Sequence, residues 1–268
     1  MRSLALPAVL TFALVTLSWN SPSDAAHRAH AADAGKADAS AISASIASPD
    51  RPQADHERDA WANPEHVLTF LGARPGMHVI DYLAADGYYS ELLSRVVGEK
   101  GEVIVYNNLG YSGFIGKKLS ERFANHRLPN TLVKVAEIND LKLAPKSLDA
   151  ALFVMSYHDV YYTPKNASGP MGDADQMVGS LFTALKPGGV VVVQDHVAQA
   201  GSDPRDSVQK LHRIDPEVVK HTFEKAGFKV DAEDGVFKNT GDDHSKLVFD
   251  PSIRHKTDQF LIRFRKPK

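Results

Sequence analysis

From residue 78 onward, apolar and polar positions alternate in short blocks, and their period switches between that of a strand and that of a helix. Residues 78–82 form an apolar run that closes on Asp81, and residues 83–87 are long enough only for a turn. Apolar residues then recur at helical spacing over 88–97, and 102–106 is a second apolar run. This pattern predicts a β-loop-α-β unit, in which the first loop lies beside a helix N-terminus and is suited to cradle a nucleoside ligand.

The alternation of strands and helices continues to the C-terminus. Most of the strands are uninterrupted apolar runs, which is typical of a parallel sheet covered on both faces by helices. The run at 258–265 alternates instead and follows 227–232 without an intervening helix, so we expect the last strand to be antiparallel. The predicted strands are 78–82, 102–106, 131–136, 148–156, 188–195, 227–232 and 258–265, and the predicted helices are 88–97, 114–124, 175–185 and 215–225.

The N-terminal 54 residues have a different pattern. A basic start, an apolar run over 4–17 and small residues at 23–25 predict a signal peptide over residues 1–25. Residues 26–54 are rich in Ala, Ser, Asp and His without an apolar period, which predicts a flexible linker. We expect one folded domain over 55–268, with an early helix that begins at Asn63-Pro64 and ends at Gly72.

Composition narrows the class of protein. The 268 residues are 43% hydrophobic and 24% charged, which is enough for one sizeable core. The net charge of −2 gives no basic field for nucleic acid, so we expect no nucleic-acid partner. The chain has no cysteine, which excludes disulfides and thiolate sites, and its export signal favours the periplasm without stable membrane insertion after cleavage. The sequence does not specify an oligomeric state.

The order of these motifs resembles the class I S-adenosylmethionine-dependent methyltransferase superfamily over roughly residues 55–268, and more narrowly an exported branch of predicted methyltransferases. The segments that carry the resemblance are 79–87, 136–149, 185–189 and 226–228, with 157–159, 211–215 and 258–260 for the narrower branch. The resemblance implies a Rossmann-like α/β fold with a seven-stranded, mostly parallel sheet, helices on both faces and an antiparallel last strand. It also implies methyl transfer from S-adenosyl-L-methionine to a small molecule.

The resemblance further indicates which residues would hold the methyl donor. The three glycine positions of the family's first loop are occupied by Leu83, Ala85 and Gly87, and asparagines replace the acid that ends the second strand. Asp81 is expected to lie near the sulfonium, and the segment after the third strand is expected to contact adenine. The predicted donor-binding residues are Asp81, Leu83, Ala85, Gly87, Asn107, Asn108, Glu137 and Ile138.

The ends of the fourth and fifth strands carry the candidate catalytic groups. Because these strands adjoin in such a sheet, His158 and Asp159 should meet Asp195 and His196. His158 is the first choice for a general base and His196 the second, since an imidazole titrates near neutral pH. We predict Asp159 as a further catalytic residue. The predicted substrate-binding residues are Tyr157, Tyr161, His212 and Arg213, with Tyr162 as a further wall of the acceptor site.

Two other interpretations of the same residues remain open. His158, Asp159, Asp195 and His196 could bind a divalent metal, although we predict no metal here. They could instead hydrogen-bond one another and only stabilise the loops. For the whole protein, the alternative to an enzyme is a non-catalytic periplasmic ligand-binding protein that has a methyltransferase fold.

Overall fold

The computed structural model describes residues 36–268, which form one compact unit. The predicted signal peptide lies outside the described residues. The predicted linker extends into them, and there its boundary is wrong, because Ala39–Ile46 forms helix α2. Asp38 accepts a hydrogen bond from the backbone N–H of Ala41 at the helix start, and Ile42 is completely buried. An Ala- and Ser-rich segment with a single buried isoleucine gives too weak a period to be recognised as a helix.

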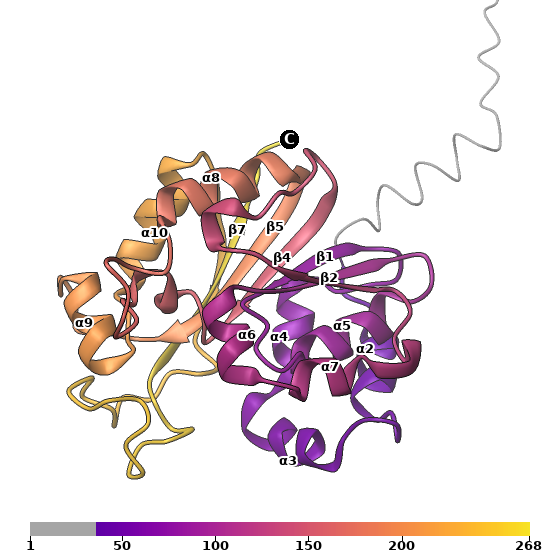
Figure 1. Ribbon diagram of the computed structural model, residues 1–268, viewed down its shortest axis with the longest axis horizontal. Helices are drawn as coiled ribbons and strands as arrows, with labels where there is room; N and C mark the ends of the chain where they lie inside the picture. The colour runs from indigo at the N-terminus through magenta and orange to yellow at the C-terminus, as the bar shows by residue number, and fades with distance from the viewer. Residues whose placement is uncertain (1–35) are drawn as a thin grey trace, which may run out of the picture. The chain divides into compact units, whose positions relative to one another are not determined.

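Seven strands form one sheet in the order β3-β2-β1-β4-β5-β7-β6 (Figure 1). All neighbouring pairs are parallel except the two that involve β7, which runs antiparallel to β5 and β6. The predicted fold class and the reversed last strand are therefore confirmed. The strands are β1 (His78–Tyr82), β2 (Glu102–Asn107), β3 (Thr131–Val135), β4 (Leu148–Val154), β5 (Leu185–His196), β6 (Lys229–Asp234) and β7 (Gln259–Arg265).

Helices cover both faces of the sheet (Figure 1). Three predicted helices, at 88–97, 175–185 and 215–225, correspond closely to observed helices. The predicted helix at 114–124 is replaced by two shorter helices. Helices α2, α3 and α9 were not predicted. Among the described residues, none of the helices is both long and apolar enough to cross a bilayer. The helices are α2, α3 (Gln53–Ala62), α4 (Pro64–Leu71), α5 (Tyr88–Val97), α6 (Leu109–Ile115), α7 (Lys118–Arg122), α8 (Ala174–Ala184), α9 (Pro204–Leu211) and α10 (Pro216–Lys225), with short 3₁₀ turns at Ala124–His126, Ile138–Asp140 and His158–Tyr161.

The pleat of the strands divides the core into two layers. Along β1, Ile80 and Tyr82 face the layer covered by α8 and α10, whereas Val79 faces the layer covered by α2, α4 and α5. Asp81 shares the second face but is a carboxylate, and it is buried. This carboxylate occupies a position where the core would otherwise contain an apolar side chain. It therefore indicates that the end of β1 borders a functional site.

Local sequence explains where the elements around β1 begin and end. Gly87 starts α5 with φ of +84°, and a Cβ there would lie 2.8 Å from the ring of Phe123, so only glycine fits. Gly72 ends α4 in the left-handed region, as predicted. Asn63 precedes α4, but its side chain makes no capping hydrogen bond, and it serves instead as a left-handed C-cap of α3.

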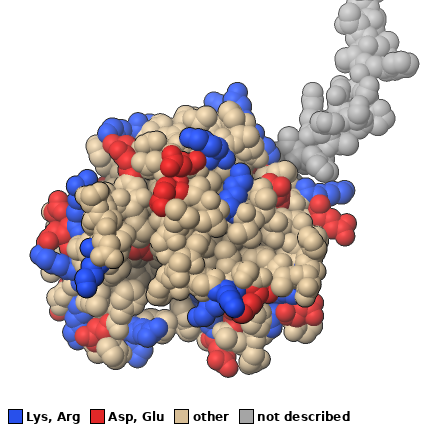
Figure 2. Space-filling model, in the orientation of Figure 1, with Lys and Arg blue, Asp and Glu red and all other residues tan. Residues whose placement is uncertain are grey.

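Charged side chains of both signs are interspersed over the surface. Figure 2 shows one face, on which Lys and Arg alternate with Asp and Glu rather than forming a continuous basic patch. This distribution agrees with the net charge of −2 for the chain.

Candidate functional site

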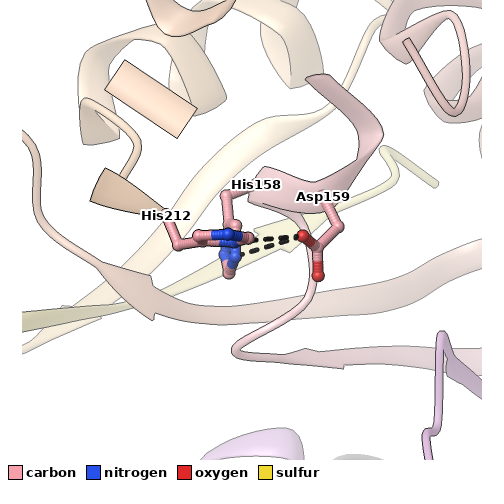
Figure 3. A group of neighbouring side chains, drawn as sticks. All are labelled: His158, Asp159 and His212. Carbon is pink, nitrogen blue, oxygen red and sulfur yellow. Dashed lines mark ion pairs between the residues drawn. The ribbon is translucent and has the colours of Figure 1, made fainter. Parts of the chain in front are cut away.

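A cavity of about 490 Å³ lies where β1, β2, β4 and β5 end. It is bounded by the first turn, by α6, by the segment after β4 and by the long loop between β6 and β7. Its wall is mostly apolar, with three histidines and one carboxylate, and Figure 3 shows part of this polar wall. The lining residues are Ala85, Gly110, Tyr111, Phe114, Ile115, Met155, His158, Asp159, Tyr162, Pro164, Met171, His196, His212, Val248 and Phe249.

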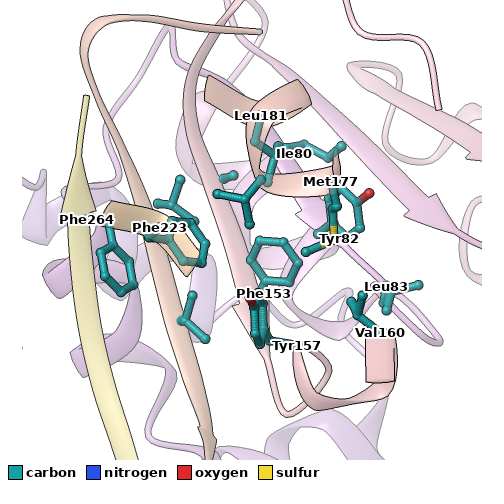
Figure 4. Close-up of a cluster of buried hydrophobic side chains, with 14 of the residues drawn as sticks. Ile80, Tyr82, Leu83, Phe153, Tyr157, Val160, Met177, Leu181, Phe223 and Phe264 are labelled. Atoms are coloured by element: carbon teal, nitrogen blue, oxygen red, sulfur yellow. The ribbon is translucent and has the colours of Figure 1, made fainter. Parts of the chain in front are cut away.

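The turn after β1 keeps a left-handed backbone although two family glycines are absent. Leu83 has φ of +54° and Ala85 has φ of +52°, conformations that normally favour glycine. The Leu83 side chain is buried in the core beside Val160 and away from the cavity, as Figure 4 shows. Of these two residues, only Ala85 lines the cavity. The two substitutions therefore leave the space above the turn open.

Asp81 supports this turn from below. Its carboxylate accepts a hydrogen bond of 2.6 Å from the hydroxyl of Ser90 in the first turn of α5, and it does not line the cavity. Burial raises the pKa of Asp81 to about 6, although the Ser90 hydrogen bond lowers it. Asp81 thus places a titratable negative charge beneath the site. This charge lies near the N-terminus of α5, and the positive end of the helix dipole stabilises it.

The two asparagines at the end of β2, Asn107 and Asn108, bind the protein itself. The amide of Asn107 accepts from the backbone N–H of Ala85 at 2.9 Å and donates to the carbonyl of Ala85 at 2.8 Å. Asn108 caps α6 by accepting from the N–H of Tyr111, and its amide nitrogen lies 3.2 Å from the sulfur of Met171. Their proposed contact with the donor ribose stays a prediction, but their visible function is to fix the first turn and α6.

Residues expected to contact adenine are separated from the cavity by the segment Met171–Gly172. Glu137 is exposed and lines a second cleft of about 740 Å³, of which Met171 and Gly172 are also part. Ile138 is buried, and a Cβ added to Gly172 would lie 2.7 Å from its side chain. Met171 lines both spaces, so it forms the partition between the cleft and the cavity.

The ends of β4 and β5 meet as expected. Asp195 is fully buried at the end of β5, and its carboxylate contacts Nδ1 of His158 at 2.7 Å and accepts from the backbone N–H of His158 at 2.9 Å. A second backbone N–H, that of His196, also donates to Asp195 at 2.8 Å. Asp195 therefore fixes the ring of His158 and directs its Nε2 toward the cavity wall.

The two candidate bases have opposite electrostatic environments. Burial lowers the pKa of His158, but the charges of Asp159 and Asp195 outweigh it and raise the pKa to about 9. Burial lowers the pKa of His196 to about 3, and the nearby Asp195 compensates only in part. The Nδ1 of His196 is 2.7 Å from the hydroxyl of Thr257. At neutral pH His196 is thus the neutral imidazole, and His158 is predominantly protonated.

Asp159 lies between two imidazoles (Figure 3). One carboxylate oxygen is 3.4 Å from Nε2 of His158 and 3.6 Å from Nδ1 of His212, and the other accepts a hydrogen bond from the hydroxyl of Tyr111. The ring of His212 stacks on Tyr162 at 5.1 Å and approaches Phe249 at 5.1 Å between ring centres. His212, placed in the sequence as a substrate contact, is part of this polar wall.

Three of the predicted substrate contacts lie elsewhere. Tyr157 is completely buried against Phe153 and does not reach the cavity. Tyr161 lines the second cleft rather than the cavity. Arg213 is completely buried and its guanidinium pairs with Asp242 and donates to two backbone carbonyls. These positions correct the predictions for Tyr157 and Arg213, whereas Tyr162 does line the cavity.

The cavity wall also includes Tyr111, Met155 and Phe249, which no sequence pattern indicated. Tyr111 comes from α6 and Phe249 from the loop after β6, and neither segment contains a recognisable motif. Met155 has a left-handed backbone conformation, with φ of +54°. Two other non-glycine residues of the cavity wall, Ala85 and His212, share this conformation. Such conformations cluster at functional sites, but a sequence does not reveal them.

Comparison with known proteins agrees with this geometry. No family model matches the chain. A ubiquinone/menaquinone biosynthesis C-methyltransferase, UbiE, from Shewanella sp. (strain W3-18-1) is 26% identical over 129 residues, which cover 48% of this chain and 46% of the relative. The same enzyme from Shewanella putrefaciens matches equally. The chain thus spans about half the length of the curated relatives it matches.

Solved structures extend the similarity over most of the chain. An S-adenosylmethionine-dependent methyltransferase from Aquifex aeolicus has a TM-score of 0.55 at 21% identity and covers 86% of this chain and 99% of its own. A putative sarcosine dimethylglycine methyltransferase from Galdieria sulphuraria has a TM-score of 0.56 at 16% identity, with 79% and 86% covered. Phosphoethanolamine N-methyltransferase 2 from Haemonchus contortus, in complex with S-adenosyl-L-methionine, has a TM-score of 0.54 at 14% identity, with 78% and 53% covered.

All of these relatives and structural neighbours are named as methyltransferases, which does not favour the alternative of a non-catalytic binding protein. The similarity to these structures shows that the chain has the fold of the class I S-adenosylmethionine-dependent methyltransferases.

Proposed function

We propose that this protein transfers a methyl group from S-adenosyl-L-methionine to a small molecule. The observation that carries the proposal is the cavity of about 490 Å³, which lies between the left-handed turn at Ala85 and the histidines at the ends of β4 and β5. Its volume and its mostly apolar wall are typical of a small-molecule site. The relatives and structural neighbours named above are methyltransferases, which supports the same reaction class.

The residues present fit the donor at its reactive end. The backbone of the first turn has the conformation that glycines would give it, and the Leu83 side chain points into the core. When bound there, S-adenosyl-L-methionine would supply an electrophilic methyl group. The buried carboxylate of Asp81 beneath the turn favours a nearby positive charge, and ionising it fully requires a pH above about 6.

The adenosine end of the donor would occupy the cleft that contains Glu137. Because Met171 and Gly172 form the partition between this cleft and the cavity, a donor that spans both requires this segment to move away from Ile138. The partition is short, and Met171 is held by the backbone of Tyr162 and the amide of Asn108. We infer that donor binding displaces these contacts.

The acceptor would lie against the aromatic wall made by Tyr111, Tyr162 and Phe249. These rings exclude water and restrict the orientation of a flat or apolar substrate, which is the main requirement for in-line methyl transfer. His158 and His196 both line the cavity and can hold or accept a proton from an oxygen or nitrogen acceptor. His196 suits proton acceptance near neutral pH because it is neutral there, whereas His158 must first lose its own proton.

Calorimetric titration of the full chain with S-adenosyl-L-methionine and S-adenosylhomocysteine tests the proposal. We expect saturable binding of one ligand per chain and its loss in Ala85→Phe, whose ring would fill the space above the turn. The matched control is Ala200→Phe, at an exposed turn outside the cavity. The absence of binding at millimolar ligand in the wild-type protein, with an unchanged circular dichroism spectrum, would overturn the proposal.

Export to the periplasm is a separate part of the proposal and depends on the signal peptide predicted over residues 1–25. N-terminal sequencing of protein recovered from a periplasmic extract tests it. We expect the mature chain to begin after residue 25. Recovery of the uncleaved chain from the cytoplasm alone would contradict export and would leave the donor-binding proposal unaffected.

A further inference from the structure

The polar wall of the cavity brings together three side chains of the kinds that bind metal ions. His158, Asp159 and His212 each offer one ligand atom, and these atoms all lie within 4.8 Å of one another (Figure 3). It is the only group of three or more such ligands within residues 36–268, the part of the chain that the structure describes. Two of its members come from the turn after β4 and the third from the end of α9, so the fold brings them together.

The separations between the Asp159 carboxylate and the two imidazoles are longer than most hydrogen bonds. The Asp159 oxygen is 3.4 Å from His158 Nε2 and 3.6 Å from His212 Nδ1. Hydrogen bonds between nitrogen and oxygen are usually 2.7–3.2 Å long. Two ligands that share one tetrahedral ion at bonds of about 2.0–2.1 Å lie about 3.4 Å apart. The carboxylate thus approaches both imidazoles at the spacing that a shared cation would require.

The surrounding contacts orient these ligands. Asp195 holds Nδ1 of His158 at 2.7 Å, which leaves Nε2 as the free nitrogen on the side of Asp159. A carboxylate on the second nitrogen of a ligating histidine is a recurring feature of metal sites. Tyr111 donates to the other oxygen of Asp159, and Tyr162 stacks on the ring of His212. All three ligands also line the cavity, so a substrate could reach a cation held there.

We propose that His158, Asp159 and His212 bind one divalent transition-metal ion in the wall of the cavity, with Asp195 as the positioning residue for His158. Two imidazoles and one carboxylate favour Zn²⁺ or Fe²⁺ over Mg²⁺ or Ca²⁺, which prefer oxygen ligands. Three protein ligands leave at least one coordination position for an oxygen of the substrate. This set differs from the one considered in the sequence, because His212 replaces Asp195 and His196 as a ligand.

The proposal has a consequence for the catalytic groups and is independent of the methyl donor. With Nε2 of His158 bound to a metal, His158 no longer serves as a base, and His196 is the remaining imidazole on the cavity wall. Metal binding itself does not require the proposed methyl transfer. A failure of the metal test therefore leaves the donor-binding test intact, and the reverse also holds.

The test is a Zn²⁺ titration of the full chain after removal of bound metal with a chelator, in competition with a chromophoric zinc indicator. Absorption spectra of the Co²⁺-loaded protein report the ligand set. All proteins carry His27→Ala and His30→Ala, because these two histidines near the N-terminus could bind zinc independently. The matched control is His244→Ala, which removes a half-buried histidine that pairs with Asp258 at 2.9 Å outside the cavity.

We expect one Zn²⁺ per chain in the parent protein and in His244→Ala. His212→Ala and Asp159→Asn should weaken binding by roughly 100-fold or more, and Asp195→Asn by about 10–100-fold. His212 is at the cavity surface, so its variant should fold even where Asp159→Asn does not. No binding in the parent protein would overturn the proposal, as would equal affinity in His212→Ala and His244→Ala.

Discussion

Two buried carboxylates, Glu91 on α5 and Asp159 in the turn after β4, have different partners. Glu91 on α5 is surrounded by three guanidinium groups, from Arg95 at 3.1 Å, Arg122 at 2.8 Å and Arg127 at 2.6 Å. Asp159 faces two imidazoles at 3.4 and 3.6 Å. Both side chains are largely or wholly removed from solvent, but only Glu91 accepts hydrogen bonds from cationic donors, whereas Asp159 accepts one from the neutral hydroxyl of Tyr111.

This difference indicates that the Glu91 group is a structural network, whereas the Asp159 group can bind another ligand. The Glu91 network joins α5 to α7 and to the segment that follows α7, and Arg122 also pairs with Asp55 of α3, so its bonds hold four parts of the chain together. The Asp159 group lies in a cavity wall, and its long separations leave imidazole nitrogens free for another ligand. We therefore expect changes at Glu91 to alter stability and changes at Asp159 to alter binding.

The largest expected effect on stability is that of Glu91→Gln. The amide would leave three arginines around a site that has lost its negative charge, and removal of one partner from a buried ion pair typically costs about 3–5 kcal/mol. Asp159→Asn should cost about 1 kcal/mol or less, because the amide oxygen can still accept from Tyr111. Urea unfolding measures both variants. Equal losses would contradict the distinction between the two regions.

Acid should destabilise the Glu91 network next. Burial raises the pKa of Glu91, but Arg127, Arg122 and Arg95 outweigh it and lower the pKa to about 2. Since the folded pKa lies below the unfolded value, the stabilisation is complete above about pH 4.5 and is lost as the pH falls toward 2, by about 3 kcal/mol in total. The unfolding free energy of Glu91→Gln, measured over the same range, should fall less steeply. Parallel curves would show that Glu91 does not contribute the difference.

A smaller effect is expected for Arg127→Ala. Its guanidinium makes two bonds of 2.6 Å to Glu91, but it is partly exposed, and Arg95 and Arg122 still balance the carboxylate. The loss should be about 2 kcal/mol, the usual range for a hydrogen bond to a charged group. Thermal and urea unfolding give the loss of unfolding free energy in this variant. Comparison with the loss in Glu91→Gln shows what share of the network's stabilisation depends on Arg127. A loss larger than that of Glu91→Gln would contradict the central position of the carboxylate.

The smallest stability effect is expected for His212→Ala. The ring is partly exposed, and it lies 3.6 Å from Asp159 and against the rings of Tyr162 and Phe249, which stay in place without it. Removal of the ring should change the free energy of unfolding by about 0.5 kcal/mol or less, while the proposed zinc binding is lost. A stability loss of several kcal/mol would instead indicate that the Asp159 group is a structural network like that of Glu91.

The sequence predicted the sheet and the meeting of the strand ends because both depend on local patterns. Strand periodicity located β1 to β7, and the adjacency of β4 and β5 brought His158 and Asp159 to Asp195 and His196. The turn at 83–87 was also located, since its length and Gly87 permit little else. These features are encoded within short windows of the chain.

Other features depend on contacts between distant segments, which no short window contains. Arg213 follows a site histidine but pairs with Asp242, and Tyr157 precedes a site histidine but faces the core. Tyr111 reaches Asp159 only because α6 packs over the end of β2. Helix α2 was missed because its stability comes from packing of Ile42 rather than from a strong period.

The most direct test of the proposed donor site is a crystal structure of the full chain with S-adenosylhomocysteine. We expect the ligand in the cavity beside Ala85, with its adenosine in the cleft of Glu137 and with Met171–Gly172 moved away from Ile138. Density for the ligand at another surface, or an unchanged partition in crystals saturated with S-adenosylhomocysteine, would contradict it.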